Sequence, residues 1–167
     1  MVENIPKYVY VFDFDGVIAY KGELYEYVID TLKELYKHNA IICLASFNYR
    51  AMDILKKHDI ANIFIAWRCG RSDTSHGVVH SLPDDHTDRL IINNKMLSKP
   101  QQISSMLYEL DKKNKLPSFD PKIIYFDDSI ENVLDALHSY DIDCWSIPVN
   151  FYIGIPKNLI TTRSRSV

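Results

Sequence analysis

Short apolar runs alternate along this chain with segments of helical periodicity, and most of the runs end in polar residues. The runs are rich in β-branched and aromatic side chains, and they cover residues 8–12, 41–45, 63–67, 123–126 and 144–149. Runs of this length and composition are typical of strands buried on both faces. The sequence therefore predicts about five buried strands, which is the pattern of a parallel sheet.

Helical segments are predicted between these strands. Leu24, Val28, Leu32 and Leu35 recur at helical spacing and predict an amphipathic helix over residues 23–38. Three further helices are expected from their N-cap residues. These run from Asn48 to about residue 57, from Ser98 with Pro100 in its first turn to about residue 113, and from Ser129 to about residue 140.

Strands that alternate with helices predict an α/β fold with a mainly parallel sheet between two helical layers. We expect a single Rossmann-like three-layer domain over residues 1–156, followed by a polar C-terminal tail at 157–167. One stretch breaks the alternation, because residues 68–88 are crowded with Arg, Ser, Asp, His, Gly and Pro and have no periodicity. We expect a long loop there, a short strand at 89–93, and a loop or minimal cap insertion over 68–98.

Composition narrows the class of protein. The chain has 167 residues, 47% of them hydrophobic and 25% charged, with a formal net charge of −3, so bulk charge does not indicate a nucleic-acid binder. No apolar stretch approaches the length of a membrane span, and no signal peptide is visible at the start. The three cysteines, Cys43, Cys69 and Cys144, are predicted to be buried free thiols of a cytoplasmic protein.

Acidic and hydroxyl side chains follow the predicted strands. Asp13 and Asp15 come after the first strand, Ser46 after the second, and Asp127 with Asp128 after the fourth. The carboxyl ends of parallel strands meet at one edge of a sheet, where ligands bind. Four neighbouring carboxylates repel one another and need a cation, and Mg²⁺ is a cation that prefers oxygen ligands.

Basic and polar residues near this edge could hold a phosphate. Lys99 opens a predicted helix, whose N-terminus favours an anion, and Ser46 offers a hydroxyl. Lys95 is an alternative phosphate ligand, but Lys99 is preferred because it opens the helix and precedes proline. Asn48 and Arg50 either face the site or simply begin a helix, and the sequence leaves both readings open.

The pattern resembles the haloacid dehalogenase superfamily of phosphohydrolases, and it carries that family's four motifs in order. The first and last motifs, at residues 9–18 (VYVFDFDGVI) and 123–132 (IIYFDDSIEN), are specific to the family. The second and third, a strand ending in Ser46 and the pair Lys99-Pro100, are weak alone and persuasive only in this order.

The resemblance implies a role for each site residue. Asp13 would be the nucleophile that forms an aspartyl-phosphate, and Asp15 would protonate the leaving oxygen and later activate water. The implied Mg²⁺ ligands are Asp13, Asp15 through its main-chain carbonyl, Asp127, and Asp128 directly or through water. The implied phosphate-binding residues are Ser46, Lys99 and, less specifically, Asn48.

The resemblance also implies a capless phosphatase. Family members differ in caps inserted after the first motif or before the lysine, and residues 17–22 and 68–98 are too short for a large cap. An acid at position 15 favours phosphate chemistry over dehalogenation. The expected substrate is a phosphorylated small molecule, phosphoprotein or polymer end, and a homo-oligomer is possible. The alternatives are a phosphotransferase or mutase of the same fold, and an idle phosphate-binding module.

Overall fold

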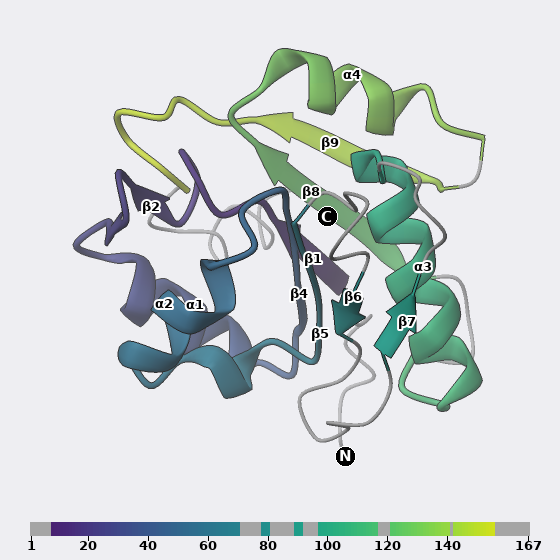
Figure 1. Ribbon diagram of the computed structural model, residues 1–167, viewed down its shortest axis with the longest axis horizontal. Helices are drawn as coiled ribbons and strands as arrows, with labels where there is room; N and C mark the ends of the chain where they lie inside the picture. The colour runs from purple at the N-terminus through teal and green to yellow at the C-terminus, as the bar shows by residue number, and fades with distance from the viewer. Residues whose placement is uncertain are drawn as a thin grey trace.

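A computed structural model describes residues 8–70, 97–116, 121–140 and 142–155, together with the backbone of two short strands at 78–80 and 89–91. Its centre is a five-stranded parallel sheet with the strand order β5-β4-β1-β8-β9 (Figure 1). The strands are β1 (Tyr8–Phe12), β4 (Ile41–Ser46), β5 (Ala66–Cys69), β8 (Lys122–Asp127) and β9 (Cys144–Pro148). The predicted parallel sheet is therefore confirmed.

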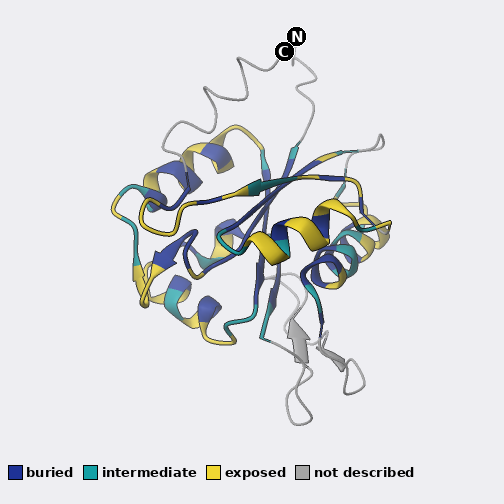
Figure 2. Ribbon diagram, turned by 90° about the horizontal axis from the view of Figure 1, so that it is seen from above, coloured by how far each residue is buried: buried dark blue, intermediate teal, exposed yellow. Residues whose placement is uncertain are grey.

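Helices cover both faces of this sheet. Helices α1 (Val28–Lys37) and α2 (Ala51–Lys57) pack on one face, and α3 (Lys99–Lys112) and α4 (Ile130–Leu137) pack on the other. Figure 2 shows the buried residues along the strands and on the inward sides of the helices. Successive β1 residues alternate between the two cores: Tyr10 and Phe12 pack on the α1 side, whereas Val9 and Val11 pack on the α3 side. This is the predicted three-layer α/β arrangement.

Two of the predicted helix starts are confirmed. Ser98 caps α3 in a capping box, because its Oγ accepts from the N–H of Gln101 and the Gln101 side chain accepts from the N–H of Ser98. Ser129 caps α4 by accepting from the N–H of Asn132 at 3.4 Å. Helix α4 ends at Leu137 rather than near residue 140.

The helix predicted over 23–38 begins later than expected. It starts at Val28, and the preceding residues form an antiparallel hairpin of β2 (Ala19–Tyr20) and β3 (Glu23–Leu24). Lys21 and Gly22 make the turn, with φ of 51° and 84°, the positive values that a two-residue hairpin turn requires. Leu24 lies in β3 but packs against the same core as α1. Its position in the sequence therefore matches the helical spacing, although it is not part of the helix.

Two other predicted boundaries were wrong. Asn48 does not cap α2, which begins at Ala51; instead its Oδ1 accepts from the N–H of Arg50 in a turn before the helix. The strand predicted at 63–67 lies at Ala66–Cys69, and a 3₁₀ turn, η1 (Ala61–Ile63), precedes it. Ile63 and Phe64 are buried there outside the sheet, and a short apolar run alone does not distinguish a strand from a turn buried in the core.

The expected long loop is only partly correct. Strands β6 (Val78–His80) and β7 (Arg89–Ile91) pair antiparallel within 68–98, and β7 corresponds to the short strand predicted at 89–93. Other residues of 71–96, the boundary at 156 and the tail at 157–167 lie outside the described residues. In the described part of the chain, no helix is both long and apolar enough to cross a membrane.

Candidate functional site

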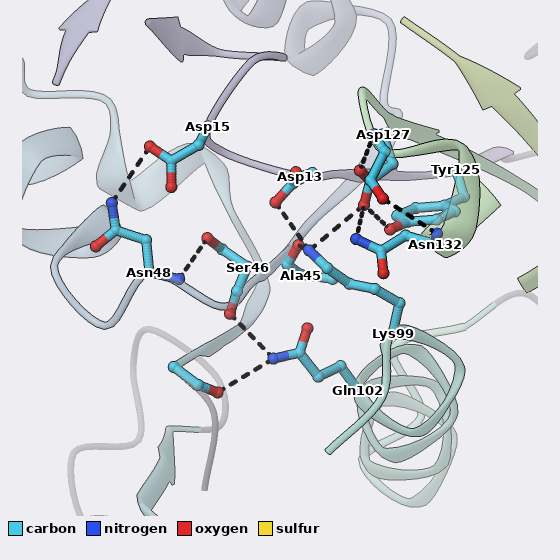
Figure 3. A network of polar contacts seen from close by, with 12 residues as sticks. Asp13, Asp15, Ala45, Ser46, Asn48, Lys99, Gln102, Tyr125, Asp127 and Asn132 are labelled. Atoms are coloured by element: carbon cyan, nitrogen blue, oxygen red, sulfur yellow. Dashed lines mark hydrogen bonds and ion pairs between the residues drawn. The ribbon is translucent and has the colours of Figure 1, made fainter. Parts of the chain in front are cut away.

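The predicted site residues lie at the carboxyl edge of the central strands. Asp13 directly follows β1, Ser46 ends β4 and Asp127 ends β8, and β1 lies between the other two strands (Figure 3). The N–H of Asp13 donates to the carbonyl of Phe126 at 2.9 Å, so the chain continues in register past the end of β1. Parallel pairing therefore brings three distant segments together, as predicted.

Lys99 joins these segments from the other side. It is the first residue of α3, its side chain is buried, and its Nζ lies 2.8 Å from Asp13 Oδ1. The same Nζ lies 2.6 Å from the Ala45 carbonyl oxygen and 3.5 Å from Asp127 Oδ2. Lys99 thus occupies the position predicted for the phosphate lysine, whereas Lys95 lies outside the described residues.

Three carboxylates form one cluster. Asp13, Asp127 and Asp128 each offer an oxygen, and these oxygens lie within 4.8 Å of one another. Gly16 permits the approach of Asp128, since a Cβ at Gly16 would lie 2.3 Å from Asp128 Oδ2. The φ of 79° at Gly16 also favours glycine. The Asp-Gly pair therefore makes room for the third carboxylate.

Hydrogen bonds fix the orientation of the Asp127 carboxylate. Its Oδ1 accepts from the N–H of Ser129 at 2.8 Å, and its Oδ2 accepts from Asn132 Nδ2 at 3.2 Å and from the Tyr125 hydroxyl. Tyr125 was missed by the sequence analysis. It stands two residues before Asp127 on β8, where both side chains face the same side of the strand, and this spacing is the signal that could have found it.

The charges in this cluster do not balance. With all three carboxylates ionised, the cluster and the Lys99 ammonium together carry two excess negative charges among the described residues. Burial raises the pKa of Asp13 to about 7; the nearby Lys99 charge lowers it and the Asp127 charge raises it further. Burial, and then the Asp127 charge, also raise the pKa of Asp128. Closely spaced oxygen ligands with this excess charge fit a hard divalent cation.

The side chain of Asp15 does not join the three carboxylates. It is exposed, and its Oδ1 accepts from Asn48 Nδ2 at 3.4 Å on the other side of Asp13 (Figure 3). The predicted metal contact of Asp15 was through its main-chain carbonyl, and that contact stays a prediction. Asn48 therefore reaches the candidate acid–base residue, whereas the Arg50 guanidinium lies 5.4 Å from the centre of the Tyr49 ring.

Ser46 is held from two directions. Its Oγ accepts from the N–H of Asn48 at 3.0 Å, and its carbonyl accepts from Gln102 Nε2 at 3.0 Å. Gln102 Nε2 also lies 3.4 Å from the Gly70 carbonyl oxygen. Gln102 therefore ties the ends of β4 and β5 to α3, one turn after Lys99.

Gln102 is a second residue that the sequence analysis missed. It is completely buried, and its Oε1 has no hydrogen-bond partner among the described residues. A polar residue three positions after Lys99 shares a helix face with it, and this spacing is the available signal. The three cysteines are free thiols, as predicted; Cys43 and Cys144 are buried as expected, whereas Cys69 is only partly buried. Burial raises the pKa of Cys43 and of Cys69 to about 12.

Comparisons with known proteins give likenesses of low similarity to solved structures. No family model matches the chain, and no curated protein matches it. Among solved structures, it is similar to the NMR structure of the core domain of a "putative phosphoglycolate phosphatase" from Streptococcus pneumoniae TIGR4. The TM-score is 0.49 with 16% sequence identity, over 97% of this chain and 96% of that chain.

Proposed function

We propose that this chain is a Mg²⁺-dependent phosphatase that hydrolyses phosphomonoesters through an aspartyl-phosphate on Asp13. The observation that carries the proposal is the 2.8 Å contact of Lys99 Nζ with Asp13 Oδ1 inside a carboxylate cluster with excess negative charge. Such a cluster attracts a divalent cation, and cation and ammonium together attract a phosphate ester. The four motifs that resemble haloacid dehalogenase phosphohydrolases support the same reading.

The metal would be held by Asp13, Asp127 and Asp128, with the main-chain carbonyl of Asp15 as a further ligand. Bound there, Mg²⁺ would neutralise negative charge on the phosphoryl group. Asp127 suits a ligand role because Ser129, Asn132 and Tyr125 already fix its carboxylate, so little side-chain freedom remains to be lost on binding. Asp128 would bind the metal directly or through a water molecule.

Asp13 and Asp15 would carry the chemistry. A carboxylate oxygen of Asp13 attacks phosphorus, the phosphorus–oxygen ester bond breaks, and Asp15 gives its proton to the leaving oxygen. Asp15 then accepts a proton from water, whose oxygen attacks phosphorus and releases inorganic phosphate from Asp13. The exposed side chain of Asp15, held by Asn48, leaves this proton path open to solvent.

Lys99 and Ser46 would hold the transferring phosphoryl group. Lys99 also aims Asp13, because Nζ bonds Oδ1 while the Ala45 carbonyl holds the ammonium in place. The Ser46 hydroxyl is positioned by Asn48 and by the Gln102 contact to its own carbonyl. No observation favours a transferase or an idle module over a phosphatase, and the segment between β5 and α3 is too short for a large cap that would exclude water.

Hydrolysis of a generic aryl phosphate with and without Mg²⁺ tests the proposal. We expect turnover that requires the metal and that Asp13→Asn abolishes. Asp135→Asn, an exposed acid on α4, is the matched control and should leave turnover unchanged. Intact-mass measurement during turnover should show a chain that carries one phosphate. Hydroxylamine should release this phosphate, because it cleaves the acyl-phosphate bond. Turnover that is independent of Mg²⁺, or equal in Asp13→Asn, would reject the proposal.

A further inference from the structure

Three aromatic rings lie in contact at the surface of the molecule. Tyr20 and Phe151 are stacked with ring centroids 6.0 Å apart, and the centroids of Phe151 and Tyr152 are 4.1 Å apart. Their exposed fractions are 39%, 37% and 74%, in chain order. We call these three residues the aromatic rim. Adjacent exposed rings that already contact one another form a surface on which a flat ligand can stack.

The aromatic rim is attached to the candidate site by two short connections. Tyr20 follows Ala19, whose carbonyl accepts from the N–H of Gly16 at 2.7 Å, and Gly16 is the residue against which Asp128 packs. Phe151 lies two residues after Val149, whose N–H donates to the main-chain carbonyl of Asp127 at 2.9 Å. The backbone that carries the rim is therefore hydrogen-bonded to the backbone on the acidic side of the cluster.

Hydrogen bonds and close packing hold the rim in place. The Tyr25 and Tyr27 hydroxyls donate to the carbonyls of Phe151 and Ile153, and the N–H of Ile155 donates to the Val17 carbonyl at 3.1 Å. Gly154, with φ of 77°, lets the Tyr25 ring pack directly on the backbone. A rim that is already ordered loses little conformational freedom when a ligand binds.

Lys21 adds a positive charge to this surface. It lies at the tip of the β2–β3 hairpin, and its Nζ is 5.4 Å from the centroid of the Tyr20 ring. Its φ of 51° is one that asparagine or glycine adopts at lower cost. A lysine at the hairpin tip thus places an ammonium beside the rings, where it favours an anionic ligand.

We propose that the aromatic rim binds the base of a nucleoside monophosphate whose phosphate enters the carboxylate cluster. The inference rests on the proposed phosphatase function and names its substrate class. In a nucleotide the sugar separates the flat base from the phosphate, which matches a rim that lies beside the cluster instead of inside it. A net charge of −3 and a rim of three rings favour a mononucleotide over a nucleic-acid strand.

The first test compares adenosine 5′-monophosphate with ribose 5-phosphate, two esters that differ only in the base. Stacking on an aromatic side chain should raise kcat/KM for the nucleotide about tenfold or more over the sugar phosphate. Each ester is assayed with the full chain and Mg²⁺. A ratio near one would overturn the proposal while leaving the proposed phosphatase function intact.

The second test removes the rings. Tyr20→Ala and Tyr152→Ala should each lower the ratio of the two kcat/KM values several-fold, and the phenylalanine variants should restore it. Tyr108→Ala is the matched control, because Tyr108 is 66% exposed on α3 and also carries a lysine, Lys112, 5.3 Å from its ring centroid. An equal ratio in all variants would contradict the rim assignment, as would a phosphotyrosine peptide hydrolysed better than the nucleotide.

Direct binding keeps the two proposals separable. If the aryl phosphate is not hydrolysed, the phosphatase proposal fails, and calorimetric titration of the full chain with each ester still tests the rim. Tighter binding of adenosine 5′-monophosphate than of ribose 5-phosphate, lost in Tyr152→Ala and kept in Tyr108→Ala, supports the rim as a base-binding surface. Equal binding of the two esters rejects it.

Discussion

Two buried ion pairs lie at opposite ends of helix α3, and they differ in charge balance. At the start of the helix, Lys99 Nζ lies 2.8 Å from Asp13 Oδ1, and near its end Glu109 Oε2 lies 2.7 Å from Arg68 Nη2. Both cations are buried. The contact distances are nearly the same, so distance alone does not distinguish the two pairs.

The surroundings of the two cations differ. Arg68 also donates to the Ser105 hydroxyl, the Ser105 carbonyl and the Trp67 carbonyl. Its partner Glu109 faces a second cation, because Lys113 Nζ lies 3.8 Å from Glu109 Oε1, so this group has no excess negative charge among the described residues. Burial lowers the pKa of Arg68, and the contact with Glu109 opposes that shift. Lys99 instead faces a cluster with two excess negative charges among the described residues. The Arg68–Glu109 pair, which has no excess negative charge, holds α3 on the sheet, whereas the cluster with excess negative charge is suited to a cationic ligand.

The largest expected effect tests the unbalanced cluster. Asp13→Asn should lower kcat by about a thousandfold or more, because it removes the nucleophile. The same change relieves repulsion between buried carboxylates, so the melting temperature should not fall. Aryl phosphate turnover and thermal unfolding are measured on the same sample. If the variant is inactive because it is unfolded, Asp13 is needed for the fold. Asp13 and Glu109 would then not differ in the way that we propose.

The Arg68–Glu109 pair should behave in the opposite way. Glu109→Gln leaves the buried Arg68 charge without its carboxylate and should lower the free energy of unfolding by about 3 kcal/mol. The folded fraction should keep its kcat, since Glu109 lies near the far end of α3 from Lys99. Urea unfolding and turnover per folded molecule measure the two effects. A large loss of kcat with little loss of stability would contradict the structural role.

Metal binding should separate the two pairs next. Mg²⁺ at about a hundred times its Kd should stabilise the native chain by about 2.7 kcal/mol, because a ligand that binds only the folded state shifts the equilibrium. Asp127→Ala should lose most of this increment, whereas Glu109→Gln should keep it in full. Thermal unfolding across a Mg²⁺ titration gives the increment. An undiminished increment in Asp127→Ala would place the cation elsewhere.

The smallest expected effect concerns Gln102, which ties α3 to the ends of β4 and β5. Gln102→Leu removes the donor to the Ser46 carbonyl and should cost about 1–2 kcal/mol of stability. It should also raise KM more than it lowers kcat, because Ser46 would hold the phosphate less firmly. Gln101→Leu, the neighbouring glutamine that only caps the helix, is the control. Equal changes in KM for the two variants would mean that Gln102 acts on the helix alone.

Local signals in the sequence predicted much of the fold. These signals are the composition of the strands, the capping residues Ser98 and Ser129, and the polar residues at the ends of β1, β4 and β8. Each of them depends only on residues that are close together in the sequence. The same signals failed where two elements share one pattern. Leu24 continues a helical spacing from within a strand, and Ile63 lies in a 3₁₀ turn rather than in the sheet.

The sequence by itself determined that Asp13, Ser46, Lys99 and Asp127 lie at strand ends or at a helix start, because each stands at the boundary of a recognisable element. Only the tertiary structure decided which of them touch. The Lys99–Asp13 contact, the Tyr125 bond to Asp127, the Gln102 bond to Ser46 and the stacking of Tyr20 on Phe151 are side-chain contacts set by packing. Three of these contacts join residues far apart in the chain, and their geometry depends on strand order and helix packing, which no local pattern encodes.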